Sequence, residues 1–358
     1  MKFAALAIGV FLAASQAQRS DALRIYVVDV EGGGATLVIS PGGQSMLIDS
    51  GSPGAAAERD SKRIAEAMRA AGLTKITYLF TTHYDGDHVG GAPAADAVAH
   101  FERFFDHGEM DPKWEQNRGI EDRYKAYLAI AAGRRTIVKA GDTIPFAGAR
   151  VDVVASQGAV IAKAINHGGS ANPYCADAEA KPPNTTENSQ SAGVLISYKD
   201  FTFLDVGDLT WDKETALACP SNKLGRVSLL LATHHGFFND QSGAPALLWA
   251  IQPQVVIANN GPRKGMADNA FERIQQVKGL EGLWQSHLAL AAERTHNAPD
   301  DMIANMEPST ECKGNWIRVD AQSNGQFTVT NGRNEFNKTY RHRAPETKPQ
   351  AASLRPQA

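Results

Sequence analysis

Short apolar segments that end directly in aspartate or histidine recur along this chain. Four of them read SMLIDSG, ITYLFTTH, FTFLDVGD and VSLLLATHHG. Their length and their content of branched and aromatic residues predict buried strands. Residues 61–72 between the first two have a helical period and end in glycine. Strands alternating with helices predict an α/β fold, and polar residues that follow such strands gather at one edge of the sheet.

Further strands are expected on both sides of this pattern. Residues 23–30 and the segment ATLVIS precede it, and residues 92 to about 133 are expected to be mostly helical. SAGVLISYKDFTFLDVGD predicts a hairpin with its turn at YKD, and GNWIRVDAQSNGQFTVTN predicts a closing hairpin with its turn at SNG. The long polar stretch from residue 166 to residue 190 is expected to be a functional loop or a disordered insertion.

The segment TTHYDGDHVGG places four potential metal ligands within six residues: His83, Asp85, Asp87 and His88. Imidazole and carboxylate together suit zinc, manganese or iron, and two such pairs suit two neighbouring ions. The alternative is that both aspartates cap a helix or stabilise a turn and the histidines are incidental.

Three other strand ends strengthen the metal interpretation. Asp49 follows one expected strand, Asp208 a second, and His234 and His235 a third. A single aspartate after a strand is usually a cap or a turn residue. Several sets of ligand-type residues at the same predicted sheet edge favour a metal centre.

The remaining composition limits where the chain works. It has 358 residues, 43% hydrophobic, with a net charge of −3, so its bulk charge does not indicate a nucleic-acid or membrane-surface protein. Residues 1–17 predict a cleaved signal peptide, and hence a secreted or periplasmic bacterial protein, the alternative being an uncleaved anchor. Of the three cysteines, we favour a Cys175–Cys219 disulfide, which leaves Cys312 as the odd thiol.

These motifs also carry a family resemblance. HYDGDH, with VGD and HHG downstream, resembles the metallo-β-lactamase superfamily, whose usual loop is HxHxDH. The HxDxDH variant is similar to a narrower branch, the hydrolase domain of the bacterial DNA-uptake competence channel and its free-standing relatives. That branch has DVGQGDA, LIDTG and an NxxS motif. This chain has DVEGGGA, LIDSG and NSQS, the last of which contains Asn188 and Ser191. The resemblance extends over roughly residues 23–333.

The resemblance implies a fold and a set of ligands. The fold is a four-layer αββα sandwich of two mixed β-sheets flanked by helices, over residues 18–340, with insertions near 92–133 and 166–190 and a disordered tail from 341 to 358. The cofactors are one or two divalent metal ions, zinc or manganese. The implied ligands are His83 and Asp85 for the first ion, Asp87 and His88 for the second, Asp208 between both, and His235 for the second.

Other residues have implied supporting roles. His234 is the alternative to His235 or a substrate contact, and Asp49 and Thr82 would orient ligands. Asn188 stands where the superfamily has a further histidine ligand, so the first ion is expected to bind more weakly. Ser191 belongs to the same motif and is a candidate substrate contact.

The implied activity is that of an exported metal-dependent hydrolase. A divalent ion lowers the pKa of water towards 7, and Asp87 would orient that water and accept its proton. We expect a phosphodiester substrate, with an ester, lactone or amide as one alternative and a non-catalytic metal-binding protein as another. Gly32 and Gly34 replace a glutamine and an acid of the branch, which argues against DNA as the substrate.

Four more residues are open to two interpretations. His287 and His296 are either surface histidines or residues that line the pocket. Arg263 and Lys264 are either a solvated basic pair or a phosphate contact.

Overall fold

The structure is a computed structural model that describes residues 21–111, 118–308 and 310–343. The predicted signal peptide and residues 344–358 of the predicted tail lie outside these ranges. Among the described residues, no helix combines the length and the apolar character needed to cross a membrane.

Within the described ranges the strands form two mixed sheets. The first has the order β18-β17-β16-β1-β2-β3-β4-β5-β6, and the second has the order β15-β14-β13-β12-β11-β10-β8-β7, with β9 paired to β8. The first sheet contains β1 (Ala22–Val27), β2 (Thr36–Ile39), β3 (Ser45–Ile48), β4 (Tyr78–Phe80), β5 (Arg103–Asp106), β6 (Arg135–Ile137), β16 (Ile317–Gln322), β17 (Gln326–Asn331) and β18 (Asn337–Arg341). The second contains β7 (Thr143–Ile144), β8 (Arg150–Ser156), β9 (Ala159–Val160), β10 (Gly193–Tyr198), β11 (Phe201–Asp205), β12 (Leu229–Leu231), β13 (Val255–Ala258), β14 (Gly282–His287) and β15 (Ile303–Asn305).

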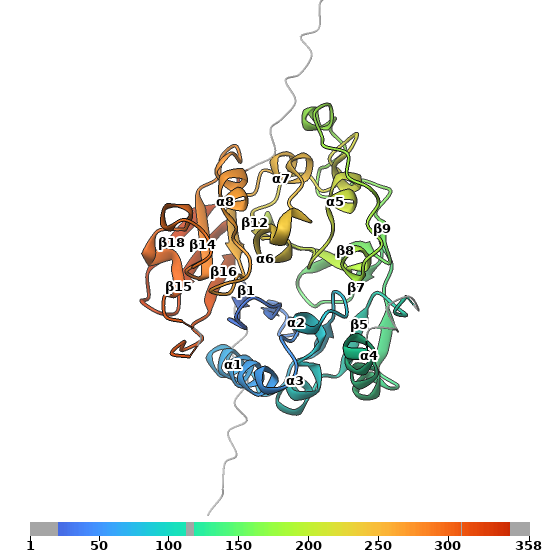
Figure 1. Ribbon diagram of the computed structural model, residues 1–358, viewed down its shortest axis with the longest axis vertical. Helices are drawn as coiled ribbons and strands as arrows, with labels where there is room; N and C mark the ends of the chain where they lie inside the picture. Colours follow the sequence, from blue (N-terminus) through green and yellow to red (C-terminus); the bar gives the residue numbers. More distant parts are fainter. Residues whose placement is uncertain (1–20, 112–117, 309, 344–358) are drawn as a thin grey trace, which may run out of the picture.

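Helices cover the outer faces of the sheets. Figure 1 shows α1, α3 and α4 on one side of the strands and α5, α7 and α8 on the other. The helices are α1 (Ala55–Ala71), α2 (Gly86–Val89), α3 (Ala92–Ala99), α4 (Arg118–Ala131), α5 (Trp211–Ala218), α6 (His234–Phe237), α7 (Pro245–Ile251) and α8 (Asp268–Gln275). Short 3₁₀ turns are η2 (Pro173–Cys175), η3 (Glu187–Gln190), η4 (Phe238–Asp240), η5 (Arg294–His296) and η6 (Asp300–Met302).

Three apolar clusters account for this layering. Phe80 of the first sheet and Phe203 of the second belong to one fully buried cluster that draws on both sheets. A second cluster joins strands of the second sheet to α5, α7 and α8, and a third joins strands of the first sheet to α1, α3 and α4. Burial of these faces supplies the main driving force for the fold. The predicted αββα architecture is therefore confirmed.

The parallel parts of the sheets position the functional residues. Strands β3 to β6 run parallel in the first sheet, and β11 to β15 run parallel in the second. Ligand sites in open α/β sheets lie beyond the carboxyl ends of such strands. The predicted strand-end residues therefore meet where both sets of strands end.

Both predicted hairpins are present. β10 and β11 pair antiparallel through a turn at Lys199–Asp200, and β16 pairs with β17 through the predicted SNG turn. The predicted disulfide is confirmed as well, because Cys175 is bonded to Cys219, and Cys312 is a free thiol.

Three predictions about element boundaries were wrong. The helix expected at residues 61–72 begins six residues earlier, at Ala55, and ends where Gly72 adopts the left-handed conformation and donates its N–H to Arg69. The region expected to be mostly helical contains the buried strand β5 between α3 and α4. Arg341, placed in the predicted tail, is the last residue of β18.

Candidate metal centre

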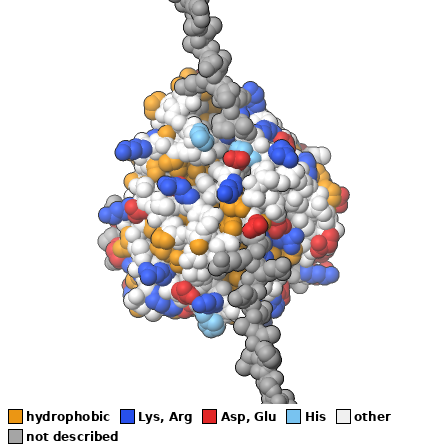
Figure 2. Space-filling view, turned by 180° about the vertical axis from the view of Figure 1, so that it is seen from behind, with side chains coloured by type: hydrophobic (Ala, Val, Ile, Leu, Met, Phe, Trp, Pro, Cys, Tyr) orange, Lys and Arg blue, Asp and Glu red, His pale blue; other side chains and the backbone are white. Residues whose placement is uncertain are grey.

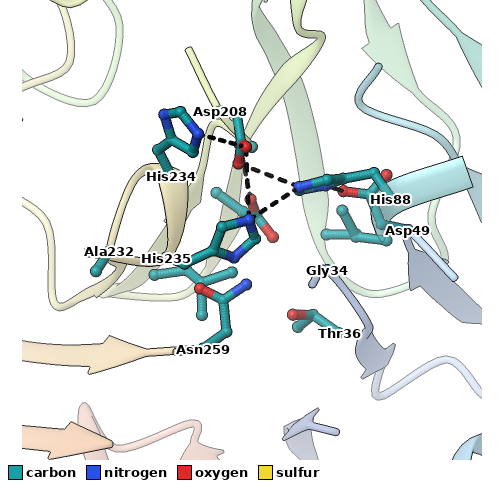
Figure 3. A pocket seen from close by; sticks show the side chains of 13 residues that line it. Gly34, Thr36, Asp49, His88, Asp208, Ala232, His234, His235 and Asn259 are labelled. Atoms are coloured by element: carbon teal, nitrogen blue, oxygen red, sulfur yellow. Dashed lines mark hydrogen bonds and ion pairs between the residues drawn. The ribbon is translucent and has the colours of Figure 1, made fainter. Parts of the chain in front are cut away.

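The side chains that follow four strands point into one buried space. Asp49 follows β3, His83 follows β4, Asp208 follows β11, and His234 follows β12. Figure 3 shows Asp208 between His234, His235 and His88, with Asp49 behind His88. All these side chains are at most 5% exposed. Both sheets therefore contribute to one site.

One group of donors is tightly clustered. Asp87, His88, Asp208 and His235 each offer a ligand atom within 4.8 Å of the others. His88 Nε2 lies 3.3 Å from Asp87 Oδ2, 3.2 Å from Asp208 Oδ1 and 3.2 Å from His235 Nε2. His235 Nε2 lies 3.1 Å from Asp87 Oδ2. Two imidazole nitrogens and two carboxylates at this spacing form a set that suits zinc or manganese.

A second, looser group faces the other oxygen of Asp208. His234 Nε2 lies 3.1 Å from Asp208 Oδ2, and His83 Nε2 lies 3.9 Å from the same oxygen. His83 Nε2 also lies 3.8 Å from Asp85 Oδ2 and is buried with no hydrogen-bond partner. A buried nitrogen in this state is costly unless it binds something. The residues of both groups thus fit divalent ions.

Burial and the charges of neighbouring groups strongly shift the pKa values of these side chains. Burial disfavours charge on His88, yet the carboxylates of Asp208, Asp49 and Asp87 raise the pKa of His88 well above its usual value. Burial likewise opposes ionisation of Asp208, but the neighbouring histidines hold its pKa well below the usual range. Burial lowers the pKa of His83, so this imidazole is neutral and its nitrogen is ready to bind a cation.

Asp49 and Thr82 hold two of the histidines in place. Asp49 Oδ2 lies 2.6 Å from His88 Nδ1 and accepts the Thr82 hydroxyl at 2.7 Å. The backbone N–H of Thr82 donates to Asp49 Oδ1, and Thr82 Oγ1 lies 2.9 Å from His83 Nδ1. These contacts turn the Nε2 atoms of both rings towards the centre. The geometry agrees with the orienting role predicted for the pair.

The backbone around the centre is tightly packed. A Cβ on Gly34 would lie 2.8 Å from both Asp49 and His88 Nδ1, and Gly34 N–H donates to the carbonyl of Asp87. An acid at this position, as the resembled branch has, would not fit here. His234 and His235 both have positive φ, a strained conformation for these residues that is frequent at functional sites.

Lys264 also reaches the centre. Its Nζ lies 2.5 Å from Asp87 Oδ2, and its side chain is 30% exposed. The interpretation of Lys264 as part of a solvated pair is therefore wrong, while Arg263 is exposed. Both residues line a cavity of about 380 Å³ together with Glu31, Pro262, Leu290, Pro308 and Thr310.

Asn188, Ser191 and Asp85 are the other residues that the sequence predicts for the site. Asn188 and Ser191 lie in or directly after η3, which runs beside Thr82 because Ala192 N–H donates to the Thr82 carbonyl at 2.7 Å. Asp85 occupies the N-cap position of α2 but makes no side-chain capping bond, which disfavours the capping alternative.

Neither additional histidine joins the centre. His287 is fully buried beside Asp29, so the surface interpretation is wrong for this residue. His296 is partly exposed, pairs with Asp268 and stacks on Phe271.

Sequence reasoning missed a buried pair next to the centre. Glu187 Oε1 accepts the N–H of Tyr84 and lies 2.7 Å from His107 Nε2. Both side chains are at most 2% exposed. His107 directly follows β5, so the same strand-end pattern could identify it, but the sequence of this region predicts mostly helix.

Comparison with known proteins identifies part of the chain. Residues 29–146 match the model of the metallo-beta-lactamase superfamily, and no curated protein matches the chain. A mutant metallo-beta-lactamase from Cronobacter sakazakii is 16% identical, with a TM-score of 0.36, over 57% of this chain and 75% of that chain. CmlA, a diiron β-hydroxylase from Streptomyces venezuelae, is 16% identical, with a TM-score of 0.42, over 73% and 52%. A putative metal-dependent hydrolase from Parabacteroides distasonis is 11% identical, with a TM-score of 0.38, over 72% and 92%.

The matched residues include Asp49 and the whole His83–His88 motif, while Asp208 and His235 follow later in the same fold. The narrower branch stays a prediction. Residues 29–146 are thus similar to the metallo-β-lactamase superfamily, and the two mixed sheets flanked by helices agree with the fold that this resemblance implies.

Proposed function

We propose that this protein is a metal-dependent hydrolase that acts on a phosphodiester. The observation that supports it is the convergence of Asp87, His88, Asp208 and His235 within 4.8 Å. A divalent ion held by such donors acts as a Lewis acid and lowers the pKa of water. We also propose export, for which the predicted signal peptide is the support.

Asp87 is the residue proposed to move the proton. Its Oδ2 is shared by His88, His235 and Lys264 at 3.3, 3.1 and 2.5 Å. Burial opposes its ionisation, but the charge of His88, hydrogen bonds from His235 and His88 and the charge of Lys264 hold the pKa of Asp87 well below its usual range. The carboxylate is therefore ionised at neutral pH, the state in which it can accept a hydrogen bond from a water and orient it.

The basic residues beside the centre favour an anionic substrate. Lys264 touches Asp87, and Arg263 lines the same cavity of about 380 Å³. Lysine and arginine are the usual partners of phosphate oxygens. Figure 2 shows one face of the molecule on which basic and acidic side chains are interspersed. The net charge of −3 also gives no general attraction for a long polyanion, which supports a small phosphodiester over DNA.

A second candidate reaction has its own support. Pro262, Leu290 and Pro308 form an apolar part of the same cavity. A cavity of mixed character suits a small ester or lactone as well as a phosphodiester. The two substrates need the same centre and differ in which part of the cavity binds them.

The test combines metal analysis with two substrates. We expect purified protein to contain a divalent metal and to hydrolyse bis-p-nitrophenyl phosphate, with a loss of about 10²–10⁴-fold in kcat for Asp87→Ala. The matched control is Asp200→Ala, an exposed aspartate in the turn between β10 and β11. Turnover of a p-nitrophenyl ester alone would select the second candidate. Bound metal with neither activity would indicate a non-catalytic metal-binding protein, and absence of metal would refute the centre.

A further inference from the structure

A second cluster of ligand-type side chains lies apart from the centre. Asp29, His287 and Cys312 each offer a donor atom within 4.8 Å of the others. Asp29 and His287 are fully buried, and Cys312 is partly exposed. They come from the segment after β1, the end of β14 and the segment before β16. The proposed hydrolytic reaction uses none of these residues.

The spacing of the three donor atoms resembles that of a coordination shell. Asp29 Oδ1 lies 2.9 Å from His287 Nε2, Cys312 Sγ lies 3.3 Å from Asp29 Oδ2, and Cys312 Sγ lies 3.8 Å from His287 Nε2. A tetrahedral zinc with bonds of about 2.0–2.3 Å holds its ligand atoms about 3.3–3.8 Å apart. Small shifts of these three side chains would allow all of them to bind one cation.

The charged side chains around the cluster leave a net negative charge that a cation could balance. Arg63 pairs with Asp29 at 2.8 Å and with Glu31 at 3.1 Å, while Arg59 pairs with Glu31 and Asp60. Two guanidinium groups thus balance two of these three carboxylates. One negative charge remains, and a thiolate would add another. A divalent cation would neutralise both, which a buried site requires.

We propose that Asp29, His287 and Cys312 form a second, thiolate-containing binding site for a divalent ion of zinc type. Binding exchanges the thiol proton for the ion, and that proton leaves to solvent, while the proton that His287 Nε2 shares with Asp29 moves to Nδ1. Cys312 is the partly exposed member, so it gives the ion its route of entry. Arg63 remains on Asp29 Oδ2, leaving Oδ1 and the ring nitrogen for the ion.

The site would support the loop that packs against the centre. Asp29 Oδ1 accepts the N–H of Glu31, and Gly33 follows two residues later against the backbone of Asp87. The carbonyl of Gly33 accepts the side-chain amide of Asn259. An ion on Asp29 would therefore fix the start of this loop. The proposal does not depend on the proposed hydrolase activity.

A cobalt titration tests the site directly. The chain has three cysteines, and two of them form the disulfide, so Cys312 is the single thiol. The donors of the main centre are nitrogen and oxygen. A near-ultraviolet sulfur-to-cobalt charge-transfer band, recorded with the disulfide intact, therefore reports Cys312 alone. We expect this band to correspond to one cobalt–thiolate bond per chain at saturation, to disappear on addition of excess zinc and to be absent in Cys312→Ser.

Besides Cys312→Ser, one further variant tests the site, and two control variants show whether its effect is specific. His287→Gln should weaken cobalt binding, followed at this band, by about tenfold or more. His296→Gln, a histidine nine residues away outside the cluster, should leave it unchanged. Asp208→Asn should abolish hydrolysis and keep the band, so failure of the hydrolase proposal is distinguishable. Absence of the band in the wild type would overturn the proposal, as would a band that His287→Gln leaves unaltered, because the thiol would then bind cobalt without its neighbours.

Discussion

The metal centre and the cluster of Asp29, His287 and Cys312 (the Asp29 cluster) balance buried negative charge in different ways. Both bury carboxylates beside imidazoles. In the centre, Asp208 faces four histidines, and Lys264 supplies a fixed positive charge through Asp87. In the cluster, Arg63 lies directly on Asp29 with 7% of its side chain exposed. The comparison teaches that imidazoles surround the carboxylates of the centre, whereas in the cluster a guanidinium group already offsets part of the negative charge before any ion binds.

Removing the positively charged side chain of Arg63 from the Asp29 cluster should have the largest effect on stability. Arg63→Ala leaves Asp29 buried without its guanidinium partner, and breaking a buried pair in this way costs about 3–5 kcal/mol. Chemical denaturation of the metal-free protein measures the loss. The control is Lys62→Ala, whose pair with Glu58 is exposed, with an expected change within about 0.5 kcal/mol. Equal effects of both variants would contradict the comparison.

The second-largest effect is expected from loss of the contact that orients His88. Asp49→Asn weakens the contact that holds His88 Nδ1, so we expect the main centre to bind zinc about 10–100-fold more weakly. A competition assay with a chromophoric chelator measures this affinity. His287 lacks such support, because its Nδ1 is buried without a hydrogen-bond partner. If His287→Gln reduced zinc affinity at the main centre as much as Asp49→Asn, the two regions would not be separate.

A buried acid outside both regions, Glu214, sharpens the comparison through pH. Burial raises the pKa of Glu214 to about 7, although backbone N–H groups of Ala244 and Gly243 oppose the shift. Between its ordinary pKa and about 7, the folded protein keeps a proton that the unfolded chain has lost. The free energy of unfolding should therefore fall as pH rises through this range.

Glu214→Gln removes this titration and isolates its contribution. We expect the wild type to lose on the order of 2 kcal/mol more than the variant between about pH 5 and pH 7. Denaturation curves at several pH values measure the difference. Parallel pH profiles for the two proteins would show that Glu214 ionises normally.

The smallest effect on stability is expected at Lys264. Its pair with Asp87 is 30% and 26% exposed on the two sides, and such pairs contribute below about 1 kcal/mol. Lys264→Ala should therefore unfold almost like the wild type, while Asp87 becomes more available to a metal ion. Zinc affinity should stay equal or increase, measured with the same chelator. A large loss of stability would show that Lys264 balances the centre as Arg63 balances the cluster.

The centre was largely predictable because its ligands follow strands with clear patterns. His83 to His88 are contiguous, and Asp208 and His235 each follow an apolar run. Lys264 was harder to predict, because a lysine after a strand has no distinctive pattern and its contact with Asp87 depends on how two sheets pack. The same holds for Asp29, His287 and Cys312, which only the tertiary structure brings together.

The fold was predictable at the level of layers and less so at the level of elements. Alternation of strands and helices indicated the α/β class, and glycine turns marked both hairpins. Strand β5 is hard to predict because it has only four residues, Arg103–Asp106, and lies between two helical stretches. The start of α1 was missed because no side chain caps it.

The pairing of β1 with β16 has a consequence for how the chain folds. Residues Ala22–Val27 lie beside residues Ile317–Gln322, nearly three hundred positions later. The first sheet therefore cannot be completed until almost the whole chain has left the ribosome. Contacts of such long sequence separation form slowly, and until then one edge of β1 is open to pairing with other chains. A chain that is truncated before β16 should aggregate instead of folding into a smaller working unit.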